Sequence, residues 1–494
     1  MIGKLRVVNS LTKEKEVFEP LNSPHVGMYV CGPTVYSDVH LGNVRTFTSF
    51  DVVYRYLKFL GYKVRYVRNI TDVGHLLDNS EEDKISKKAK LENLEPMEVV
   101  QKYTNDFHRV MELFNNLDPD IEPTATGHLI EQLQMIDELV EKGYAYESNG
   151  SVYFDIEKYN KEYSYGKLSG RKTEDLLSQT RELDGQSDKR NPLDFALWKN
   201  ASPEHIMRWK TKWGVGFPGW HLECSVMSTK YLGEQFDIHG GGMDLKFPHH
   251  ECEIAQNAGT HGNDGAKYWL HTNMLTVNGT KMSKSLGNSF LPKELIAGDH
   301  EMLDRGYSPM TIRFFMLQSH YASTLDFSNE ALNAAQKGYT KLANGLRYVQ
   351  EVAYPEGTQE APDEKQISQI KKICENCHHA MNDDFNTALT IGHLFNLLKK
   401  FNSLQTGQLQ FGQLGKEVFD QMKTTFLGFT QDVLGLRLEL DLKGEKLVDV
   451  VLTEYKAAKE AKDYEKVDAL RAELKQLGIV VKDMKNQIDW AFEE

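Results

Sequence analysis

Residues 26–43 read VGMYVCGPTVYSDVHLGN, a pattern that predicts a strand, a Gly-Pro turn and the start of a helix. Apolar residues then recur at helical spacing as far as Leu60, and Gly61 stops the helix. A β-rich segment follows at residues 64–70. Strand, helix and strand in this order make a βαβ unit. The sequence therefore predicts an α/β fold built on a Rossmann-like parallel sheet.

The first predicted strand ends at Cys31, which places the next loop at the carboxyl end of the sheet. Open α/β folds bind their ligands at that edge. No G-x-G-x-x-G motif opens the unit, which argues against ordinary dinucleotide binding. We expect residues 31–43 and 281–285 to face one crevice that holds a nucleotide in another way.

The length and the local sequence patterns predict several domains. A chain of 494 residues is long enough for about three domains with separate cores. Residues 144–154 read as a β-hairpin around an Asn149-Gly150 turn, which a parallel sheet would not supply. From Ala331 apolar residues step by three and four, as in a helical bundle, and a last helix stops at Gly478 before two strand-like pieces. We expect a catalytic domain in two halves at 1–120 and 216–330, a connective insertion at 121–215, an α-helical bundle at 331–430 and a small C-terminal α/β module at 431–494.

Composition narrows the functional class. A net charge of −13 argues against a general polycation, so any contact with nucleic acid must use local basic patches. The five cysteines are too few and too scattered for a disulfide scaffold, and the first 18 residues have no apolar signal-peptide core. No apolar run reaches the roughly 20 residues that cross a bilayer. We expect a cytoplasmic protein without a membrane role.

Residues 281–285 read KMSKS and set two lysines on a short serine-containing loop. Lysine holds phosphate as a flexible point charge, and lysines near oxygens that gain charge lower the barrier to displacement at phosphorus. Lys281 and Lys284 therefore suit a leaving pyrophosphate. For an isolated motif of this length the alternative is a solvated basic turn.

Cys31, Cys224, His249 and Glu253 are candidate metal ligands. His249 and Glu253 are four residues apart, so on a helix both side chains share one face, whereas the cysteines must arrive from distant loops. The spacing of these residues does not by itself establish a metal site. In the alternative interpretation, the cysteines are small buried hydrophobic residues and His249 is a hydrogen-bonded core histidine.

Residues 40–43, HLGN, resemble the HIGH signature of class I aminoacyl-tRNA synthetases, and residues 281–285 resemble their KMSKS loop. With residues 219–224 (GWHLEC) and 247–253 (FPHHECE), the chain resembles the cysteinyl-tRNA synthetase family nearly end to end. The resemblance implies ATP-dependent formation of cysteinyl-adenylate from L-cysteine and transfer to tRNA(Cys). It also implies a monomer, Mg²⁺ with ATP, no editing domain, and tRNA held by the helical bundle and the C-terminal module.

The resemblance further assigns site residues. It implies that one Zn²⁺ ion is bound by Cys31, Cys224, His249 and Glu253, and that the amino acid is contacted by Gly32, Thr71 and Trp220. Zinc can expand to five ligands, so the substrate sulfur can bind it directly and lose its proton, whereas the serine hydroxyl is a poorer, harder ligand. Chemistry, rather than pocket size, would then select the amino acid.

The nucleotide is expected at the start of the first helix. His40 and Asn43 can donate hydrogen bonds to phosphate, and Gly42 leaves room at the positive end of the helix dipole. Asn43 departs from the usual histidine of the signature and cannot become cationic. Asp244, after three glycines, is a candidate acceptor for a ribose hydroxyl, with a ligand-free turn as the alternative. His40, Lys281 and Lys284 are the expected catalytic residues.

Other motifs are assigned lesser roles. Cys252 is expected to point about 100° away from Glu253 on a helix and not to bind the metal. For His221, His239 and His250 the alternatives are orientation of ligands, substrate contact, or an ordinary core or surface position. Residues 374–378 fit the C-x-x-C-H haem pattern, but Cys374 and Cys377 fall on an apolar stripe, which favours core packing. Lysines and an arginine between 456 and 475 suit tRNA phosphates or a solvated face.

Three other functions remain as alternatives. A related cysteine ligase would pass cysteine to an amino-sugar, but the long helical C-terminal half argues against it. A zinc hydrolase would need an open coordination position and leaves the KMSKS loop unexplained. An RNA-binding regulator without activity would not need His40 and Lys284.

Overall fold

A parallel sheet forms the centre of the computed structural model, which describes residues 3–74, 84–172, 188–282, 287–439, 442–483 and 488–492. Its four strands lie in the order β11–β10–β3–β4 and span Ala266–Thr272, Phe236–Gly242, His25–Val30 and Lys63–Arg68. Every neighbouring pair in this sheet is parallel. The predicted α/β fold with a parallel sheet is confirmed.

Helix α1 (Leu41–Phe59) crosses from β3 to β4, which confirms the predicted βαβ unit. One face of α1 buries Val44, Phe47 and Phe50 in the main core, and the helix packs against both β4 and β10. The carboxyl ends of β3 and β10 therefore open beside the N-terminus of α1. A small hairpin of β1 (Arg6–Asn9) and β2 (Glu14–Val17) flanks the sheet.

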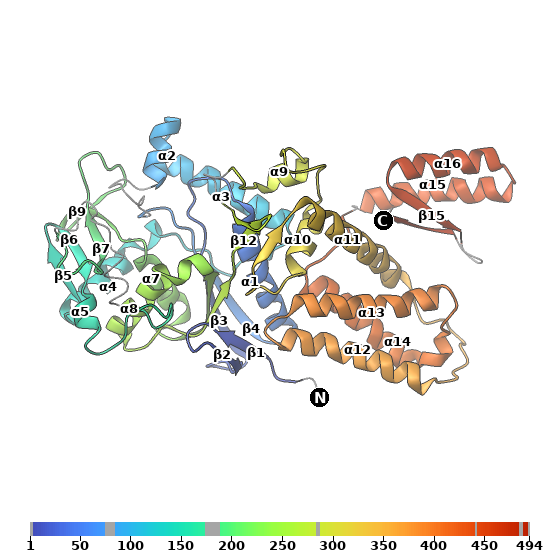
Figure 1. The fold of residues 1–494 in the computed structure, drawn as a ribbon, viewed down its shortest axis with the longest axis horizontal. Coiled ribbons are helices and arrows are strands. Elements are labelled where there is room, and N and C mark those ends of the chain that lie inside the picture. Colours follow the sequence, from blue (N-terminus) through green and yellow to red (C-terminus); the bar gives the residue numbers. More distant parts are fainter. Residues whose placement is uncertain are drawn as a thin grey trace.

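Between β4 and β10 the chain leaves the parallel sheet. Helices α2 (Lys84–Glu92) and α3 (Pro96–Leu113) come first, followed by η1 (Thr126–His128) and α4 (Leu129–Glu141). A five-stranded antiparallel sheet then forms at one end of the molecule (Figure 1). Its strands, in the order β5–β6–β7–β9–β8, are Ala145–Ser148, Ser151–Phe154, Phe195–Asn200, Gly214–Pro218 and Trp209–Thr211, with the short helix α5 (Ile156–Tyr159) after β6.

The predicted hairpin is the pair β5 and β6. Asn149 and Gly150 join these strands with φ values of 49° and 77°, as a type I′ turn requires. The hairpin is thus confirmed, whereas the boundaries 121–215 of the connective insertion stay a prediction.

The second half of the parallel sheet carries two helices that reach the site. α7 (Leu222–Leu232) precedes β10, and η3 (Met243–Lys246) and α8 (His249–His261) connect β10 with β11. Next come β12 (Leu275–Val277) and β13 (Thr280–Lys281), which form a small sheet with β14 (Leu325–Phe327), while α9 (Pro292–Ala297) and α10 (Pro309–Leu317) lie between them in sequence. Lys281 ends β13; Lys284 lies outside the described residues.

The helices predicted after Ala331 are present. α11 (Asn329–Glu351), α12 (Glu364–Asn382), α13 (Thr387–Gln405) and α14 (Phe411–Leu427) pack as a bundle that ends in the π-helical segment η5 (Gly428–Val433) (Figure 1). Cys374 and Cys377 are buried in the core of this bundle, which confirms their packing role. None of the helices described in this chain combines the length and the hydrophobicity that a membrane span requires.

A buried ionic cluster joins the bundle to α1. The guanidinium of Arg313 on α10 is fully buried and donates to the Asp51 carboxylate on α1 at 2.5 Å, to the Phe114 carbonyl at 2.7 Å and to the Leu434 carbonyl at 2.8 Å. Arg55 donates to the same carboxylate at 2.8 Å. Because each charge has a partner, the cluster avoids the large cost of an isolated buried charge and fixes the end of the bundle to the helix that begins after His40.

The C-terminal module follows as α15 (Leu442–Glu460), α16 (Tyr464–Gln476), β15 (Ile479–Asp483) and β16 (Ile488–Phe492). Gly478, with a φ of 73°, ends α16 as predicted, and two antiparallel strands follow. The module has its own core and touches α11 through β16. There the Arg347 guanidinium lies 4.1 Å from the centre of the buried Trp490 ring.

We predict that Arg347→Ala loosens the attachment of the C-terminal module, because a desolvated cation–π contact contributes about 1–2 kcal/mol. Hydrogen exchange should then speed up in β15 and β16 while the parallel sheet keeps its protection. Lys337→Ala, an exposed change on the same helix, is the control. Unchanged exchange in β16 of the Arg347 variant would show that this contact does not attach the module.

Candidate functional site

Four candidate ligands converge at the carboxyl edge of the parallel sheet. Cys31 follows the last residue of β3, Cys224 lies in the first turn of α7, and His249 and Glu253 are one turn apart on α8. One ligand atom from each lies within 4.8 Å of the other three, and all four side chains are buried. The fold thus brings together residues that the sequence separates by as many as 222 positions.

The distances among these atoms suit a bound cation. Cys31 Sγ lies 3.5 Å from Cys224 Sγ and 3.6 Å from Glu253 Oε1, and His249 Nε2 lies 3.2 Å from the same Oε1. Two sulfurs, a nitrogen and an oxygen at such spacings can surround one metal ion.

The thiols are protonated unless a cation is bound. Burial, the Cys224 thiol and the nearby carboxylates raise the pKa of Cys31 well above its usual range. Burial and the carboxylates of Glu253 and Glu223 raise the pKa of Cys224 to about 12, although its hydrogen bond with Cys31 offsets part of that shift. Metal binding requires deprotonated sulfur and therefore releases protons. Metal affinity at this site should accordingly rise with pH.

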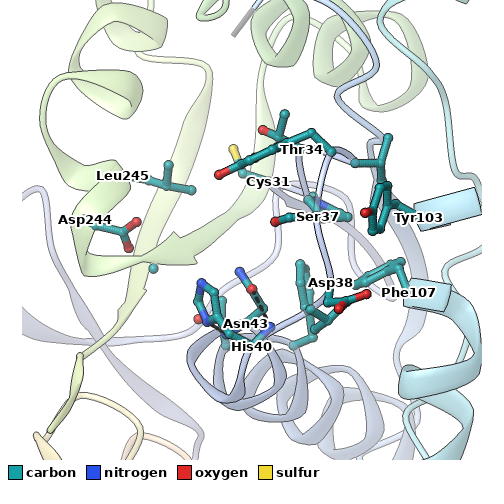
Figure 2. Close-up of a pocket in the computed structure, with 18 of the residues that line it drawn as sticks. Cys31, Thr34, Ser37, Asp38, His40, Asn43, Tyr103, Phe107, Asp244 and Leu245 are labelled. Atoms are coloured by element: carbon teal, nitrogen blue, oxygen red, sulfur yellow. Dashed lines mark hydrogen bonds between the residues drawn. The ribbon is translucent and has the colours of Figure 1, made fainter. Parts of the chain in front are cut away.

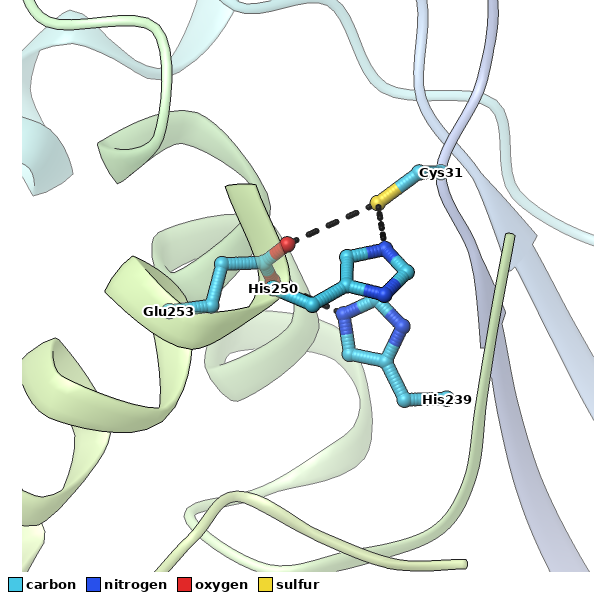
Figure 3. A group of neighbouring side chains, drawn as sticks. All are labelled: Cys31, His239, His250 and Glu253. Atoms are coloured by element: carbon cyan, nitrogen blue, oxygen red, sulfur yellow. Dashed lines mark hydrogen bonds and ion pairs between the residues drawn. The ribbon is translucent and has the colours of Figure 1, made fainter. Parts of the chain in front are cut away.

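A second, overlapping set shares two of these residues. It consists of Cys31, His239, His250 and Glu253 (Figure 3). His250 Nε2 lies 3.3 Å from Cys31 Sγ, and His239 Nε2 lies 2.8 Å from Glu253 Oε2. The sequence predicted only that these histidines orient ligands, contact substrate, or occupy an ordinary core or surface position; their direct contact with candidate ligands appears only in the fold.

The surrounding histidines are held neutral. Burial lowers the pKa of His221 to about 4 and that of His271 to about 3, and it lowers the pKa of His250 well below its usual range. Neutral rings can each donate and accept, and His250 Nδ1, His271 and Ser10 form a chain with spacings of 2.9 and 2.8 Å. This chain ties His250 to the flanking β1–β2 hairpin. His221 Nδ1 lies 3.1 Å from His249 Nδ1.

Cys252 is separate from both sets found among the described residues. Its sulfur lies 3.4 Å from the Tyr165 hydroxyl, and the thiol is buried in the core that α8 shares with the antiparallel sheet.

A cavity of about 420 Å³ opens beside the ligand cluster (Figure 2). It extends between Asp244 and Leu245 on one side and Tyr103 and Phe107 on the other. Six of the site residues that the sequence predicted line this cavity: Cys31, Gly32, His40, Asn43, Trp220 and Asp244. Met282, next to Lys281, also lines it, so the start of the 281–285 loop reaches the cavity.

His40 and Asn43 cap the helix that borders this cavity. The Asn43 amide N–H donates to His40 Nδ1 at 3.3 Å, and the His40 amide N–H donates to Asn43 Oδ1 at 3.2 Å. This reciprocal capping box gives Asn43 a local reason to stand where the signature has histidine. Its side-chain oxygen is engaged, which leaves the amide nitrogen as its donor toward a ligand.

The glycines before Asp244 are required by packing. A Cβ on Gly240 would lie 2.3 Å from the Phe50 ring, and one on Gly241 would lie 2.7 Å from the His250 ring. Close approach of neighbouring side chains therefore requires glycine at both positions. Packing restricts Gly42 less tightly. A Cβ added there would lie 3.1 Å from the nearest atoms, which belong to the His40 ring.

Thr71 pairs with Thr34, a residue that lines the cavity, but is not itself among the lining residues. Its buried hydroxyl donates to the Glu223 carboxylate, which also accepts from Asn69 Nδ2 at 3.2 Å. Burial raises the pKa of Glu223 well above its usual range, and the hydrogen bond from Thr71 offsets part of that shift. Sequence reasoning missed Asn69 and Glu223; their only signal was adjacency to Thr71 and Cys224.

We predict that Gly32→Ala disrupts this edge of the sheet, because a Cβ on Gly32 would lie 1.6 Å from the Asn69 carbonyl oxygen. The backbones must separate, and we expect a loss of roughly 2–4 kcal/mol in unfolding free energy, measured by chemical denaturation. Gly392→Ala in α13, where no atom lies within 4 Å of the added carbon, should leave the protein as stable or slightly more stable. Equal stability of the two variants would contradict the packing at Gly32.

Three family models match the chain. Residues 17–337 match the class I (C) tRNA synthetase catalytic domain, residues 377–439 match a DALR domain, and residues 446–490 match a cysteinyl-tRNA ligase anticodon-binding domain.

Full-length relatives match as well. The chain is 58% identical over 494 residues to a cysteine–tRNA ligase from Cytophaga hutchinsonii and 53% identical over 498 residues to one from Bacteroides fragilis, and each alignment covers 99% of both proteins. Among solved structures, a Mycobacterium tuberculosis methionyl-tRNA synthetase in complex with methionyl-adenylate is similar with a TM-score of 0.59, at 13% identity, over 86% of this chain and 94% of that one. This last likeness shows the fold.

Proposed function

The chain belongs to the cysteine–tRNA ligase family of class I synthetases, and on this premise we propose how its residues select and activate cysteine. It activates L-cysteine with ATP to cysteinyl-adenylate and transfers the cysteinyl group to tRNA(Cys) in translation. The match of residues 446–490 to an anticodon-binding domain disfavours the amino-sugar ligase.

The observation that carries the proposal is the buried set Cys31, Cys224, His249 and Glu253 beside the cavity. We propose that it binds one Zn²⁺ ion. With Zn–S bonds of about 2.3 Å and Zn–N and Zn–O bonds of about 2.1 Å, a tetrahedron has S···S, S···O and N···O edges of about 3.8, 3.6 and 3.4 Å. The corresponding separations here are 3.5, 3.6 and 3.2 Å, which supports a single four-ligand site.

Zinc at this position would supply a Lewis acid that prefers the thiol of cysteine to the harder hydroxyl of serine and lowers the pKa of the thiol. The protein adds shape to this selection. The Trp220 ring, 4.4 Å from the His249 ring between centres, forms an apolar wall of the cavity beside the ligands. Gly32 also lines the cavity.

Mg²⁺-bound ATP is proposed to lie along the N-terminus of α1. The dipole of this helix favours phosphate, His40 and Asn43 stand at its first turn, and Asp244 across the cavity can accept from a ribose hydroxyl. The cysteine carboxylate then attacks the α-phosphorus, and pyrophosphate leaves. Lys281 and Lys284 stabilise the charge that develops on it.

Transfer of the cysteinyl group to tRNA is proposed to take place in the same cavity. A ribose hydroxyl of the terminal tRNA adenosine attacks the carbonyl of the adenylate, and AMP leaves. Neither step needs a covalent bond to the enzyme, so positioning and charge stabilisation supply the rate enhancement.

The tRNA is proposed to contact the helical bundle and the C-terminal module. Lys456, Lys462 and Lys475 are exposed basic candidates for phosphate contacts on the module. Lys459 and Arg471 instead pair with Asp483, and Lys466 pairs with Glu454, so part of the predicted basic face serves the module itself.

We further propose that the protein acts as a monomer in the cytoplasm. Its five cysteines are all buried free thiols, which suits a reducing compartment. Sedimentation of the purified protein with and without tRNA would measure the oligomeric state.

ATP–pyrophosphate exchange tests the proposed activity. Exchange should depend on cysteine and not on serine, and the protein should charge tRNA(Cys) but not an amino-sugar acceptor. Exchange without charging of tRNA would contradict the assignment.

We predict that Cys224→Ser abolishes stoichiometric zinc binding, because an alcohol at this position is a far weaker ligand than a thiolate. Metal content after gel filtration measures the effect. Cys252→Ser is the matched control, since Cys252 is equally buried and lies next to Glu253 but outside the set. Retention of one zinc per chain in the Cys224 variant would contradict the proposed ligands.

We predict that Lys284→Ala slows adenylate formation far more than it weakens cysteine binding, because the lysine acts on charge that appears during displacement. Pre-steady-state adenylation and equilibrium cysteine binding separate the two effects. Parallel losses in both measurements would assign the lysine to ground-state binding instead.

A further inference from the structure

The two candidate thiol ligands come from unrelated elements. Cys31 follows the end of β3 and Cys224 lies in the first turn of α7, 193 residues later, yet their sulfurs lie 3.5 Å apart. No covalent bond sets this spacing, because both cysteines are free thiols. Something in the packing must hold the two backbones in register.

The side chain of Asn69 bridges the residues next to both cysteines. Its Oδ1 accepts from the amide N–H of Gly32, which follows Cys31, at 2.8 Å. Its Nδ2 donates at 3.2 Å to the carboxylate of Glu223, which precedes Cys224. One amide group thus connects the β3 edge with the start of α7.

The donor and acceptor chemistry fixes the orientation of this amide. The Gly32 N–H can only donate, so the oxygen of Asn69 must face it, and the NH₂ group then faces Glu223. The same Oδ1 lies 3.7 Å from Cys224 Sγ. Asn69 therefore contacts the backbone beside one ligand and the sulfur of the other.

Glu223 is anchored on its own side. The Thr71 hydroxyl donates to the same carboxylate oxygen, and Asn69, Thr71 and Glu223 are all at most 2% exposed. Asn69 Nδ2 also donates to the Thr71 hydroxyl oxygen at 3.2 Å. Loss of the Glu223 side chain would therefore leave the Thr71 hydroxyl and one of the two Asn69 N–H donors without this acceptor away from water, which costs about 1–3 kcal/mol for each buried donor.

We propose that Glu223 and Asn69 are positioning residues that set the spacing of the Cys31 and Cys224 sulfurs. This inference rests on the proposed metal site. Residues that orient metal ligands in this way commonly change metal affinity by about 10–100-fold when they are removed.

The test is zinc affinity of the full-length protein, measured by competition with a chromophoric chelator. Glu223→Ala should weaken affinity by about 10–100-fold. Glu223→Gln keeps an oxygen that accepts from Asn69 and Thr71 and should retain most of the affinity. Gly32, Asn69, Glu223 and Thr71 form the hydrogen-bonded relay of this proposal. If Glu223→Gln loses as much zinc affinity as Glu223→Ala, the relay is the wrong explanation.

Glu251→Gln is the matched control. Glu251 is equally buried and lies between the ligands His249 and Glu253. Its carboxylate accepts hydrogen bonds from the amide N–H groups of Leu168 and Ser169. Among the described residues it makes no hydrogen bond to the relay. Its replacement should lower thermal stability without a comparable loss of zinc affinity. Equal losses in the Glu251 and Glu223 variants would overturn the proposal.

Two further outcomes separate the hypotheses. If the wild-type protein binds no zinc, the proposed metal site fails; if it binds zinc and Glu223→Ala binds as tightly, only the positioning role fails. Should Glu223→Ala not fold, Thr71→Val removes one donor to Glu223 at nearly constant size and should still weaken zinc affinity measurably. Unchanged affinity in that folded variant would contradict the relay.

Discussion

Two thiols, an imidazole and a carboxylate are buried within 4.8 Å of one another at the carboxyl edge of the parallel sheet. Polar groups of this kind are costly to remove from water unless hydrogen bonds or a cation compensate them. The chain supplies hydrogen bonds around the set through Asn69, Glu223 and the buried histidines. The set itself is acidic and soft, and a divalent metal compensates it best. The cavity, which Met282 and the capped start of α1 help to line, opens beside this point.

Buried contacts also link the site to the parts of the chain that are proposed to contact tRNA. Asp51 and Arg313 fix α1, which begins after His40, to the end of the helical bundle, and Arg347 on α11 contacts Trp490 of the C-terminal module. Both contacts are buried, so neither is weakened much by salt. A series of packed elements, α11 and α10, therefore connects the module to the helix at which ATP is proposed to bind.

Local patterns predicted the elements well. Helical periodicity and Gly61 located α1, Asn149-Gly150 located a hairpin, and the apolar stripe located Cys374 and Cys377 in the bundle core. Contacts between distant segments were beyond such patterns: periodicity cannot show that His250 reaches Cys31, that Gly240 makes room for Phe50, or that Asn69 joins Gly32 to Glu223. The four ligands themselves came from resemblance, because their spacing alone did not exclude ordinary core packing.

The central claim is that the four side chains select cysteine through the metal ion they hold. The most direct measurement compares exchange with cysteine and with serine in protein stripped of zinc and in the same protein after zinc is restored. We predict that stripping lowers the preference for cysteine in kcat/KM and that added zinc restores it. An undiminished preference in metal-free protein that still catalyses exchange would contradict the claim.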